Sequence, residues 1–535
     1  MLFNSYAFIF GFLPLALGAF WLAGRFGRDA ALLALILASI AFYAFWRPFN
    51  VVLMAPSMAL NYLIARQLQR DAEARPGRAR VLLWAGIAFN VAFLGYFKYL
   101  AFGETVVNDV FGAGLILTRI ILPLGISFIT FQKIAFLIDV QAGRIERFTL
   151  RDYVLFVLFF PQLIAGPIVH YREMMPQFHA APCRFRAEDT AVGISLFAFG
   201  LFKKVALADP IATYVSPIYA ATAAGHPPGL FGAWFAALGF TLQVYFDFSG
   251  YTDMALGLAR LFGMQLPPNF NSPLRASNIV DFWLRWHMTL TRFLTAYIYN
   301  PLSLALTRRR VARGKRVLGG RNPSWSAFPT LLMFPTVLTM FISGLWHGAG
   351  YTFILWGLLH GVYLVINHAW RLLRPRLFPD PKRYTRWARG AGFALTFPAV
   401  VISMVMFRAP SVAAALAIWH GMTGAGGATI PAVVLHGLGT LGAAIGALGI
   451  GASAASGAIF VHGWLWLAAG LAIALGAPNT LQILADHGPA LGVKPAAGRR
   501  VVWRPSAGWA VALAAVAGVG ILSLGQLTAF IYWQF

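Results

Sequence analysis

Two histidines in tryptophan-rich segments are the residues of this sequence best suited to acid–base chemistry. His287 lies in DFWLRWHMTLTR and His347 lies in GLWHGAG, where Gly344, Gly348 and Gly350 let the backbone or a ligand approach closely. An imidazole held among indole rings tends to stay neutral because desolvation disfavours its charged form. A neutral imidazole can act as a general base. We therefore expect the pair to deprotonate an acceptor hydroxyl while the hydroxyl oxygen attacks a thioester. This reaction requires no metal.

Each histidine taken alone has a structural alternative. An intramembrane histidine often forms a hydrogen bond to a neighbouring helix. His287 follows Trp286, and His347 follows Trp346. This repeated pattern favours a reaction centre over two separate structural hydrogen bonds. We assign both tryptophans to the lining of the site. His360, in GLLHG, is a weaker candidate because one polar stripe on a helix explains it.

The segment around His287 has a helical spacing of polar residues. Asp281, Arg285 and Thr289 recur at intervals of four, which would place them on one face of a helix. His287 would then project from another face, among tryptophan and leucine side chains.

The elements that must position these residues are membrane helices. Hydrophobic residues make up 59% of the 535 positions and charged residues 11%, whereas a soluble globular protein carries about 25% charge. Apolar runs of roughly 20 residues span a bilayer, and about 11 to 14 runs here are long enough to span or re-enter it. We therefore predict an all-α polytopic membrane protein. Residues 1–392 would form a core that contains the histidine centre, and residues 393–535 would add transmembrane helices and an outward-facing tail.

The positive charge of the chain indicates how it is oriented. The net charge is +25, but Lys and Arg cluster in short loops between apolar runs. That pattern is typical of cytoplasmic loops that meet anionic lipid, and not of a nucleic-acid partner. The basic blocks at residues 308–321 and 371–389 are therefore expected in the cytoplasm, which places His347 near the outer turn between them. Block 308–321 would also attract an anionic acyl donor, such as coenzyme A or an acyl carrier protein.

Proline, glycine and polar residues interrupt the apolar runs. Pro161, Gly166 and Pro167 predict a broken or re-entrant helix within residues 153–167. The region 247–277 is predicted to be polar and rich in turns. Further spans are expected near residues 430–451, 460–475 and 509–524. Cys183 is the single cysteine, which excludes a disulfide within the chain.

Four polar side chains of the region 247–277 are candidates for lining the site: Asp247, Asp253, Asn269 and Asn271. Each has an alternative role. The two asparagines are flanked by prolines and are typical turn formers. The two aspartates can instead cap a short helix or pair with Arg260 or Arg275.

One long stretch resembles the signature of the membrane-bound O-acyltransferase (MBOAT) superfamily, and especially its bacterial alginate O-acetyltransferase branch: FDFSGYTDMALGLARLFGMQLPPNFNSPLRASNIVDFWLRWHMTLTRFLTAYIYNPL, followed by GLWHGAGYTFILWGLLHG. GISFITFQKIAFLIDV, FFPQLIAGPIVHY and the closing FIYWQF are similar to that branch as well. The resemblance implies a helical fold in which a cytoplasmic funnel admits an acyl donor and an outward-facing cavity presents it to an acceptor. His347 matches the GLWHG histidine that is held essential in the family, and His287 matches the histidine of the FWxRWH motif.

The resemblance further implies an O-acyltransferase of the bacterial inner membrane, with several passes through the bilayer. It would move an acetyl group from acetyl-CoA or another cytoplasmic thioester, with no bound cofactor, toward an exopolysaccharide such as alginate. A periplasmic acetyltransferase-like partner would complete the modification. D-alanyl transfer to teichoic acid is the alternative within this class. A polytopic transporter or flippase is the alternative outside it, although the inverted repeat common in transporters is not evident in the sequence.

Tyr532 is a candidate acyl relay. It lies in IYWQF, which resembles a Tyr-x-x-Phe tail found in a small partner protein of the related D-alanylation systems. A phenol at this position can accept the acyl group and pass it on, which would split one transfer into two. The alternative is an interfacial aromatic anchor, since Trp533 is its neighbour.

Overall fold

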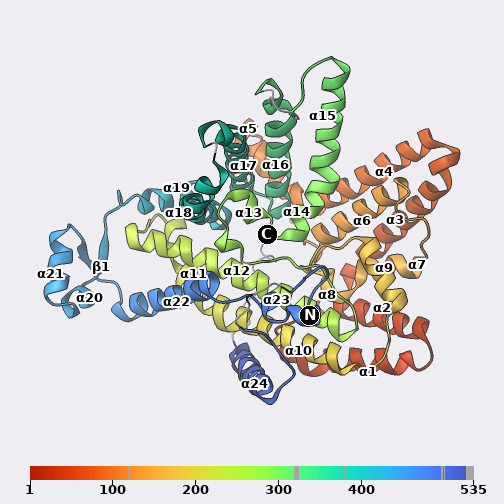
Figure 1. Ribbon diagram of the computed structural model, residues 1–535, viewed down its shortest axis with the longest axis horizontal. Helices are drawn as coiled ribbons and strands as arrows, with labels where there is room; N and C mark the ends of the chain where they lie inside the picture. The colour runs from red at the N-terminus through yellow and green to blue at the C-terminus, as the bar shows by residue number, and fades with distance from the viewer. Residues whose placement is uncertain (118–119, 319–324, 379, 496–497, 499–500, 526–535) are drawn as a thin grey trace. The chain divides into compact units, whose positions relative to one another are not determined.

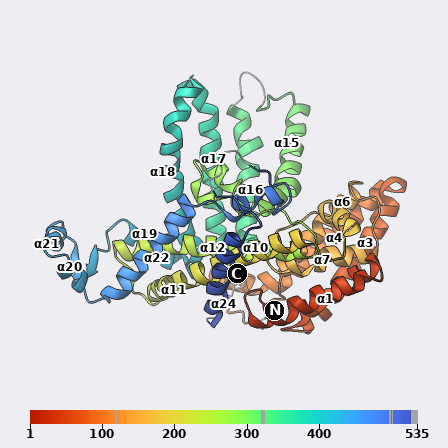
Figure 2. The same ribbon diagram turned by 60° about the horizontal axis from the view of Figure 1, so that its bottom comes forward.

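The protein is helical throughout most of the part that the computed structural model describes, residues 1–117, 120–318, 325–378, 380–495, 498 and 501–525 (Figure 1, Figure 2). Within these residues, nine helical segments are long and apolar enough to cross a membrane by length and composition. The strands found there are β1 (Thr429–Pro431) and β2 (Gly451–Ser453), which pair in parallel with Ile430 opposite Ala452. The predicted all-α polytopic membrane fold is confirmed.

The chain divides into two compact units whose segments interleave along the sequence. The first contains Met1–Lys204, Ser249–Asn269 and residues 480–525, and the second contains Val205–Phe248 and Phe270–Asn479. The predicted division of the chain at residue 392 stays a prediction.

The first unit is built from helices of the N-terminal part and from a C-terminal helix. α1 packs on α2, α3 packs on α4 and α6, and α10 packs on α24. The helices are η1 (Ala7–Phe12), α1 (Leu13–Gly24), α2 (Arg28–Ala44), α3 (Phe49–Ala74), α4 (Pro76–Leu94), η2 (Gly95–Tyr99), α5 (Leu100–Phe111), α6 (Ile126–Gln141), α7 (Leu150–Leu158), α8 (Phe160–Leu163), α9 (Tyr171–Ala180), α10 (Ala187–Phe202), α23 (Thr480–Ile483), η8 (Ala485–His487), α24 (Ala507–Leu522) and η9 (Ser523–Gly525). Helix η3 (Lys203–Ala208) begins in this unit and ends in the second.

The break predicted within residues 153–167 is present between α7 and α8. α7 begins with a capping box in which the Thr149 hydroxyl accepts a hydrogen bond from the Asp152 backbone N–H. The helix ends at Leu158, and its C-cap residue Phe159 leaves the helical conformation with a ψ of 106°. Because of the break, the Phe160 N–H has no partner within the helix. It donates a hydrogen bond to the Ser39 hydroxyl at 3.2 Å. A protein side chain thus satisfies the exposed donor, as the absence of water from the bilayer core requires.

Helix α12 (Leu230–Leu261) corrects the prediction for residues 247–277, because the helix continues well into that region. Its last part packs on α10 through two glycine pairs. A Cβ on Gly257 would lie 2.5 Å from the Gly193 carbonyl oxygen, and one on Gly200 would lie 2.5 Å from that of Gly250. The polar side chains here are buried at helix contacts and do not end the helix. Irregular backbone follows after Leu261.

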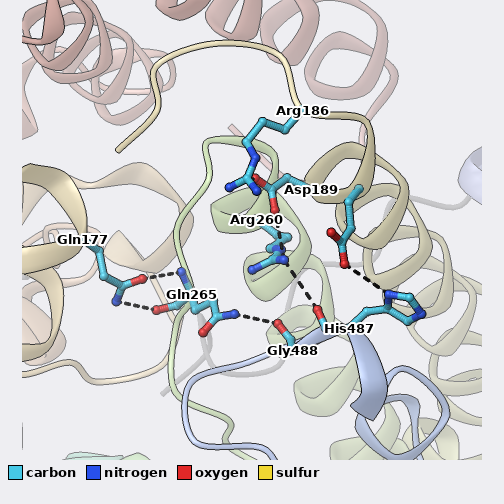
Figure 3. Close-up of polar contacts among 8 residues, drawn as sticks. Gln177, Arg186, Asp189, Arg260, Gln265, His487 and Gly488 are labelled. Carbon is cyan, nitrogen blue, oxygen red and sulfur yellow. Dashed lines mark hydrogen bonds and ion pairs between the residues drawn. The ribbon is translucent and has the colours of Figure 1, made fainter. Parts of the chain in front are cut away.

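A polar network connects the C-terminal segment to other parts of the first unit (Figure 3). Arg260, near the end of α12, pairs with Asp189 at 2.9 Å and reaches the His487 carbonyl oxygen at 3.5 Å. Gln265 donates through its side chain to the Gly488 carbonyl at 2.8 Å. These bonds hold a segment near residue 488 against the end of α12, more than 220 residues away in sequence.

The second unit contains the two segments with the candidate histidines. Its helices α16, α17 and α18 follow one another, with α16 packed on α17 and α17 on α18 (Figure 2). The helices are α11 (Asp209–Ala223), the first part of α12, η4 (Pro273–Arg275), α13 (Ile279–Trp283), α14 (Met288–Leu294), η5 (Thr295–Tyr299), α15 (Asn300–Ala312), η6 (Trp325–Ala327), η7 (Pro329–Met333), α16 (Phe334–His347), α17 (Tyr351–Leu377), α18 (Pro381–Arg408), α19 (Val412–Met422), α20 (Ala432–Gly437), α21 (Thr440–Ala447) and α22 (Gly457–Gly476).

The span predicted near residues 430–451 is wrong. The structure has β1, α20, α21 and β2 in this region, and the two helices contain six and eight residues. Gly439 separates them with a positive φ of 55°, a conformation that glycine adopts at little cost. The helices predicted near residues 460–475 and 509–524 are confirmed as α22 and α24.

Candidate active site

His347 is positioned by a closely packed helical hairpin. It is the last residue of α16, and α17 begins four residues later at Tyr351. A Cβ on Gly344 would overlap the Phe353 carbonyl oxygen, and one on Gly357 would overlap that of Met340. Small residues therefore let the two helices approach closely, as is common in membrane helix pairs. The predicted position of His347 at the turn between two helices is confirmed.

His287 is positioned by a bend between two short helices. α13 ends at Trp283 and α14 begins at Met288, and His287 between them has φ 44° and ψ 51°. The continuous helix predicted here from the spacing of four is therefore wrong, although Asp281 and Arg285 do form an ion pair at 2.7 Å. A histidine in the left-handed region costs about 1–3 kcal/mol and persists where the surrounding structure imposes it. Such strain is typical of functional sites.

The two histidines are brought together in the interior of the second unit. Their ring centroids lie 6.2 Å apart, and the side chains are 0% and 3% exposed. Trp346 is adjacent to both, at 6.0 Å from His287 and 4.9 Å from His347. Phe248 of α12 covers His287 at 4.7 Å, and Phe407 of α18 covers His347 at 5.4 Å. The two imidazoles therefore share one buried aromatic enclosure.

A third histidine supports this enclosure and was underestimated from the sequence. The Trp283 indole N–H donates to Nδ1 of His360 at 3.3 Å, and Nε2 of His360 lies 2.9 Å from the Ser403 hydroxyl. Because that hydroxyl donates its own proton to the Val400 carbonyl at 2.6 Å, Nε2 of His360 must be the donor to Ser403. Both ring nitrogens are thus occupied. His360 joins α13, α17 and α18, which is a positioning role.

Trp356 connects the two parts of the site. Its ring lies 5.1 Å from that of His347 and 4.9 Å from that of His360. It is 1% exposed. The sequence analysis did not single out Trp356. Its spacing of four from His360 could have signalled that the two share a face of α17, but Ser403, the partner of His360, lies on another helix.

The other candidates of the second unit have different surroundings. Trp286 is buried and packs against Phe282 and Phe270, with ring centroids at 5.6 and 5.1 Å. Asp247 is buried and directly precedes Phe248. Asn271 is exposed, and its side-chain oxygen accepts a hydrogen bond from Asn479 at 3.1 Å.

Two candidates belong to the first unit, which does not contain the histidine pair. Asn269 is fully buried. Asp253 forms an ion pair with Lys203 at 2.5 Å. The alternative partners predicted for Asp253 are wrong, because Arg260 pairs with Asp189 and Arg275 donates to the Ala474 carbonyl at 3.2 Å. Tyr532 lies outside the described residues.

Helices long and apolar enough to cross a membrane hold a buried pair of histidines, an arrangement suited to a membrane-embedded enzyme. Residues 138–315 match the model of MBOAT, the membrane-bound O-acyltransferase family. A peptidoglycan O-acetyltransferase of Helicobacter pylori is 37% identical over 461 residues, which cover 80% of this chain and 81% of that protein. A probable alginate O-acetylase AlgI of Pseudomonas aeruginosa is 36% identical over 427 residues, covering 79% and 75%. A teichoic acid D-alanyltransferase of Streptococcus thermophilus is 27% identical over 296 residues, covering 53% and 68%.

This chain therefore belongs to the membrane-bound O-acyltransferase family. It is a multi-pass membrane protein and an acyltransferase, as the resemblance in its sequence implied. The family match includes His287, and His347 follows it in sequence.

Replacing His287 with asparagine separates its backbone role from its chemical role. Asparagine tolerates the left-handed conformation, so we expect His287→Asn to unfold at the same temperature as the wild type while acyl transfer falls at least ~100-fold. His287→Ala should lose activity and also about 1 kcal/mol of stability, since alanine adopts this conformation poorly. Thermal unfolding in detergent and acyl transfer by matched membranes measure the two effects. Full activity of His287→Asn would show that the imidazole is not needed.

Replacing Ser403 with alanine tests the support of the enclosure. The buried Nε2–H of His360 would lose its acceptor, which should cost about 1–3 kcal/mol. The matched control is Ser195→Ala, because the buried Ser195 hydroxyl bonds only to the Ala191 carbonyl of its own helix at 2.7 Å among the described residues. Thermal unfolding of both variants checks the difference. Equal melting temperatures would mean that the bond to His360 does not stabilise this region.

Proposed function

We propose that this protein transfers an acetyl group from a cytoplasmic thioester to a hydroxyl outside the inner membrane, for the O-acetylation of a polysaccharide. The observation that supports this most is the pair of buried imidazoles, 6.2 Å apart, at the end of the α16–α17 hairpin. The names of the relatives support the acetyl group and a glycan acceptor, since one is a peptidoglycan O-acetyltransferase and another a probable alginate O-acetylase.

In the proposed reaction, His347 acts as the general base. Its neutral imidazole accepts the proton of the acceptor hydroxyl as the oxygen attacks the thioester carbonyl carbon. A C–O bond forms, and the tetrahedral intermediate then breaks its C–S bond. The departing thiolate takes the proton from the imidazolium, which restores the neutral base. His287, on the other side of the small group, orients the hydroxyl or the carbonyl.

The surroundings of His347 suit this reaction. Aromatic rings of Trp346, Trp356 and Phe407 contact its imidazole, and a dry enclosure protects a thioester from hydrolysis. Ser343 lies one helical turn before His347 and is 0% exposed, and its hydroxyl forms no hydrogen bond with any described residue. We assign its hydroxyl to the carbonyl oxygen of the donor, where negative charge develops in the transition state.

Charge and the sequence resemblance support the proposed donor and partners. Acetyl-CoA or an acyl carrier protein would approach the basic residues 308–321, of which Arg308 and Arg309 are exposed at the end of α15. A periplasmic acetyltransferase-like protein would receive the acetyl group and complete the modification. Tyr532 is proposed as the acyl relay between the thioester donor and the periplasmic partner. Its alternative role is that of an interfacial aromatic anchor.

The acetyl content of glycans from cells that express variants tests this function. His347→Gln should reduce acetylation of the target glycan at least ~100-fold at equal membrane levels. Secreted polysaccharide and peptidoglycan are analysed separately, so the result also identifies the acceptor. Tyr532→Phe abolishes acetylation if the phenol carries the acetyl group and leaves it unchanged if the ring is an anchor. If His347→Gln instead shows normal acetylation and impaired polymer export, the protein is a transporter and not a transferase.

Ser343→Ala tests the assignment of the hydroxyl near His347. We expect acetate incorporation to fall about a hundredfold with little change in thermal stability, because no described residue loses a hydrogen bond. Thr339→Val is the matched control one turn earlier on α16, where the Thr339 hydroxyl bonds to the Pro335 carbonyl at 2.7 Å. Equal incorporation by both variants would remove Ser343 from the reaction.

A further inference from the structure

A groove of about 810 Å³ lies in the second unit, apart from the histidine pair. It is bounded by α13 and the residues before it, by the C-terminal half of α17, and by the N-terminal half of α18. α17 and α18 pack side by side as an antiparallel pair (Figure 2). Tyr363 lines the groove, and its ring lies 5.6 Å from that of His360. The groove therefore adjoins the cluster that supports the site, while neither His287 nor His347 lines it.

The inner wall of the groove combines close packing with a polar group. A Cβ on Gly392 of α18 would overlap the Ser277 carbonyl oxygen, and both residues line the groove. The side-chain oxygen of Asn367 is buried and accepts no hydrogen bond from any described residue. Asn367 lines the same groove, so a bound molecule with an N–H or O–H group can satisfy this oxygen.

One end of the groove is basic. Arg371 near the end of α17 and Arg389 near the start of α18 line it, and neither forms an ion pair within the described part of the chain. Both residues are exposed. Trp370 and Trp387 line the same end, and indole rings are enriched at the level of lipid headgroups. Arginine pairs readily with phosphate through two parallel hydrogen bonds.

The other end of the groove carries exposed apolar side chains beside Asp281, whose carboxylate is paired with Arg285 at 2.7 Å. Leu284, Ile366 and Leu395 line it and are 62%, 61% and 75% exposed. Ile366 and Leu395 belong to α17 and α18, which are both long and apolar enough to cross a membrane. Exposed apolar side chains on such helices face hydrocarbon. The groove thus changes from basic to apolar along the two helices.

We propose that this groove binds an anionic phospholipid. Arg371 and Arg389 hold the phosphate, the Asn367 oxygen accepts a hydrogen bond from the headgroup, and an acyl chain lies along Leu284, Ile366 and Leu395. A water-soluble phosphate compound would leave that apolar end uncovered. The positive-inside rule assigns the arginines to the cytoplasmic leaflet, whose anionic lipids attract basic segments. The lipid contacts α13, whose Trp283 donates a hydrogen bond to His360. Lipid binding therefore helps to hold α13 in place.

The test compares lipids and variants in thermal unfolding of the purified full-length protein. Phosphatidylglycerol in mixed micelles should raise the melting temperature of the wild type by roughly 3 °C or more relative to phosphatidylcholine. Arg371→Gln/Arg389→Gln should lose this increase. Arg313→Gln/Arg376→Gln removes the same charge from exposed arginines that do not line the groove, and it should keep the increase.

Two outcomes would overturn the proposal. An equal increase in all three proteins would mean that phosphatidylglycerol acts through general charge and not through this groove. Stabilisation by inorganic phosphate or coenzyme A, lost in Arg371→Gln/Arg389→Gln and without an effect of phosphatidylglycerol, would mean that the groove binds a soluble phosphate. Because these measurements use unfolding and not acetyl transfer, they are independent of the proposed function.

Discussion

The structure depends on one constraint: a polar group within the bilayer must find its partner inside the protein. The break between α7 and α8 is tolerated because the Ser39 hydroxyl accepts the Phe160 N–H. Asp253 is tolerated because Lys203 pairs with it at 2.5 Å. The His360 imidazole uses both nitrogens, one for Trp283 and one for Ser403. In these three places a buried polar group forms a link between helical segments.

The same constraint distinguishes the two candidate catalytic histidines from the supporting one. His360 has a neutral form fixed by its two partners, so it has no nitrogen left for a substrate. His347 instead ends a helix at a glycine-rich turn, among the rings of Trp346, Trp356 and Phe407. A rigid aromatic enclosure on closely packed helices can hold an imidazole in one orientation, which is what general-base catalysis requires.

The sequence predicted those features that depend on local pattern. The two basic blocks placed His347 near the turn of a hairpin, and the prolines predicted the break after α7. The bend at His287 could not be predicted, because DFWLRWHMTLTR contains neither glycine nor proline and tertiary packing imposes the left-handed conformation. The length of α12 was underestimated because two of its charged residues pair with distant segments, Asp253 with Lys203 and Arg260 with Asp189, and such pairs have no local signature. Hydropathy suggested a span at residues 430–451, where Gly439 instead separates two short helices. The bond between His360 and Ser403 joins residues 43 positions apart and has no local signature.

The interleaving of the two compact units has a consequence for biosynthesis. The first unit needs α24 against α10 and the segment near Gly488 against the end of α12, but these parts are separated in the chain by most of the second unit. At typical rates of about 5–20 residues per second, the ribosome needs tens of seconds to make the intervening residues. The N-terminal helices must therefore wait in the membrane with the α10 surface for α24 uncovered. During that interval lipid or the insertion machinery must shield this surface, and a pause in translation there would prolong the exposure.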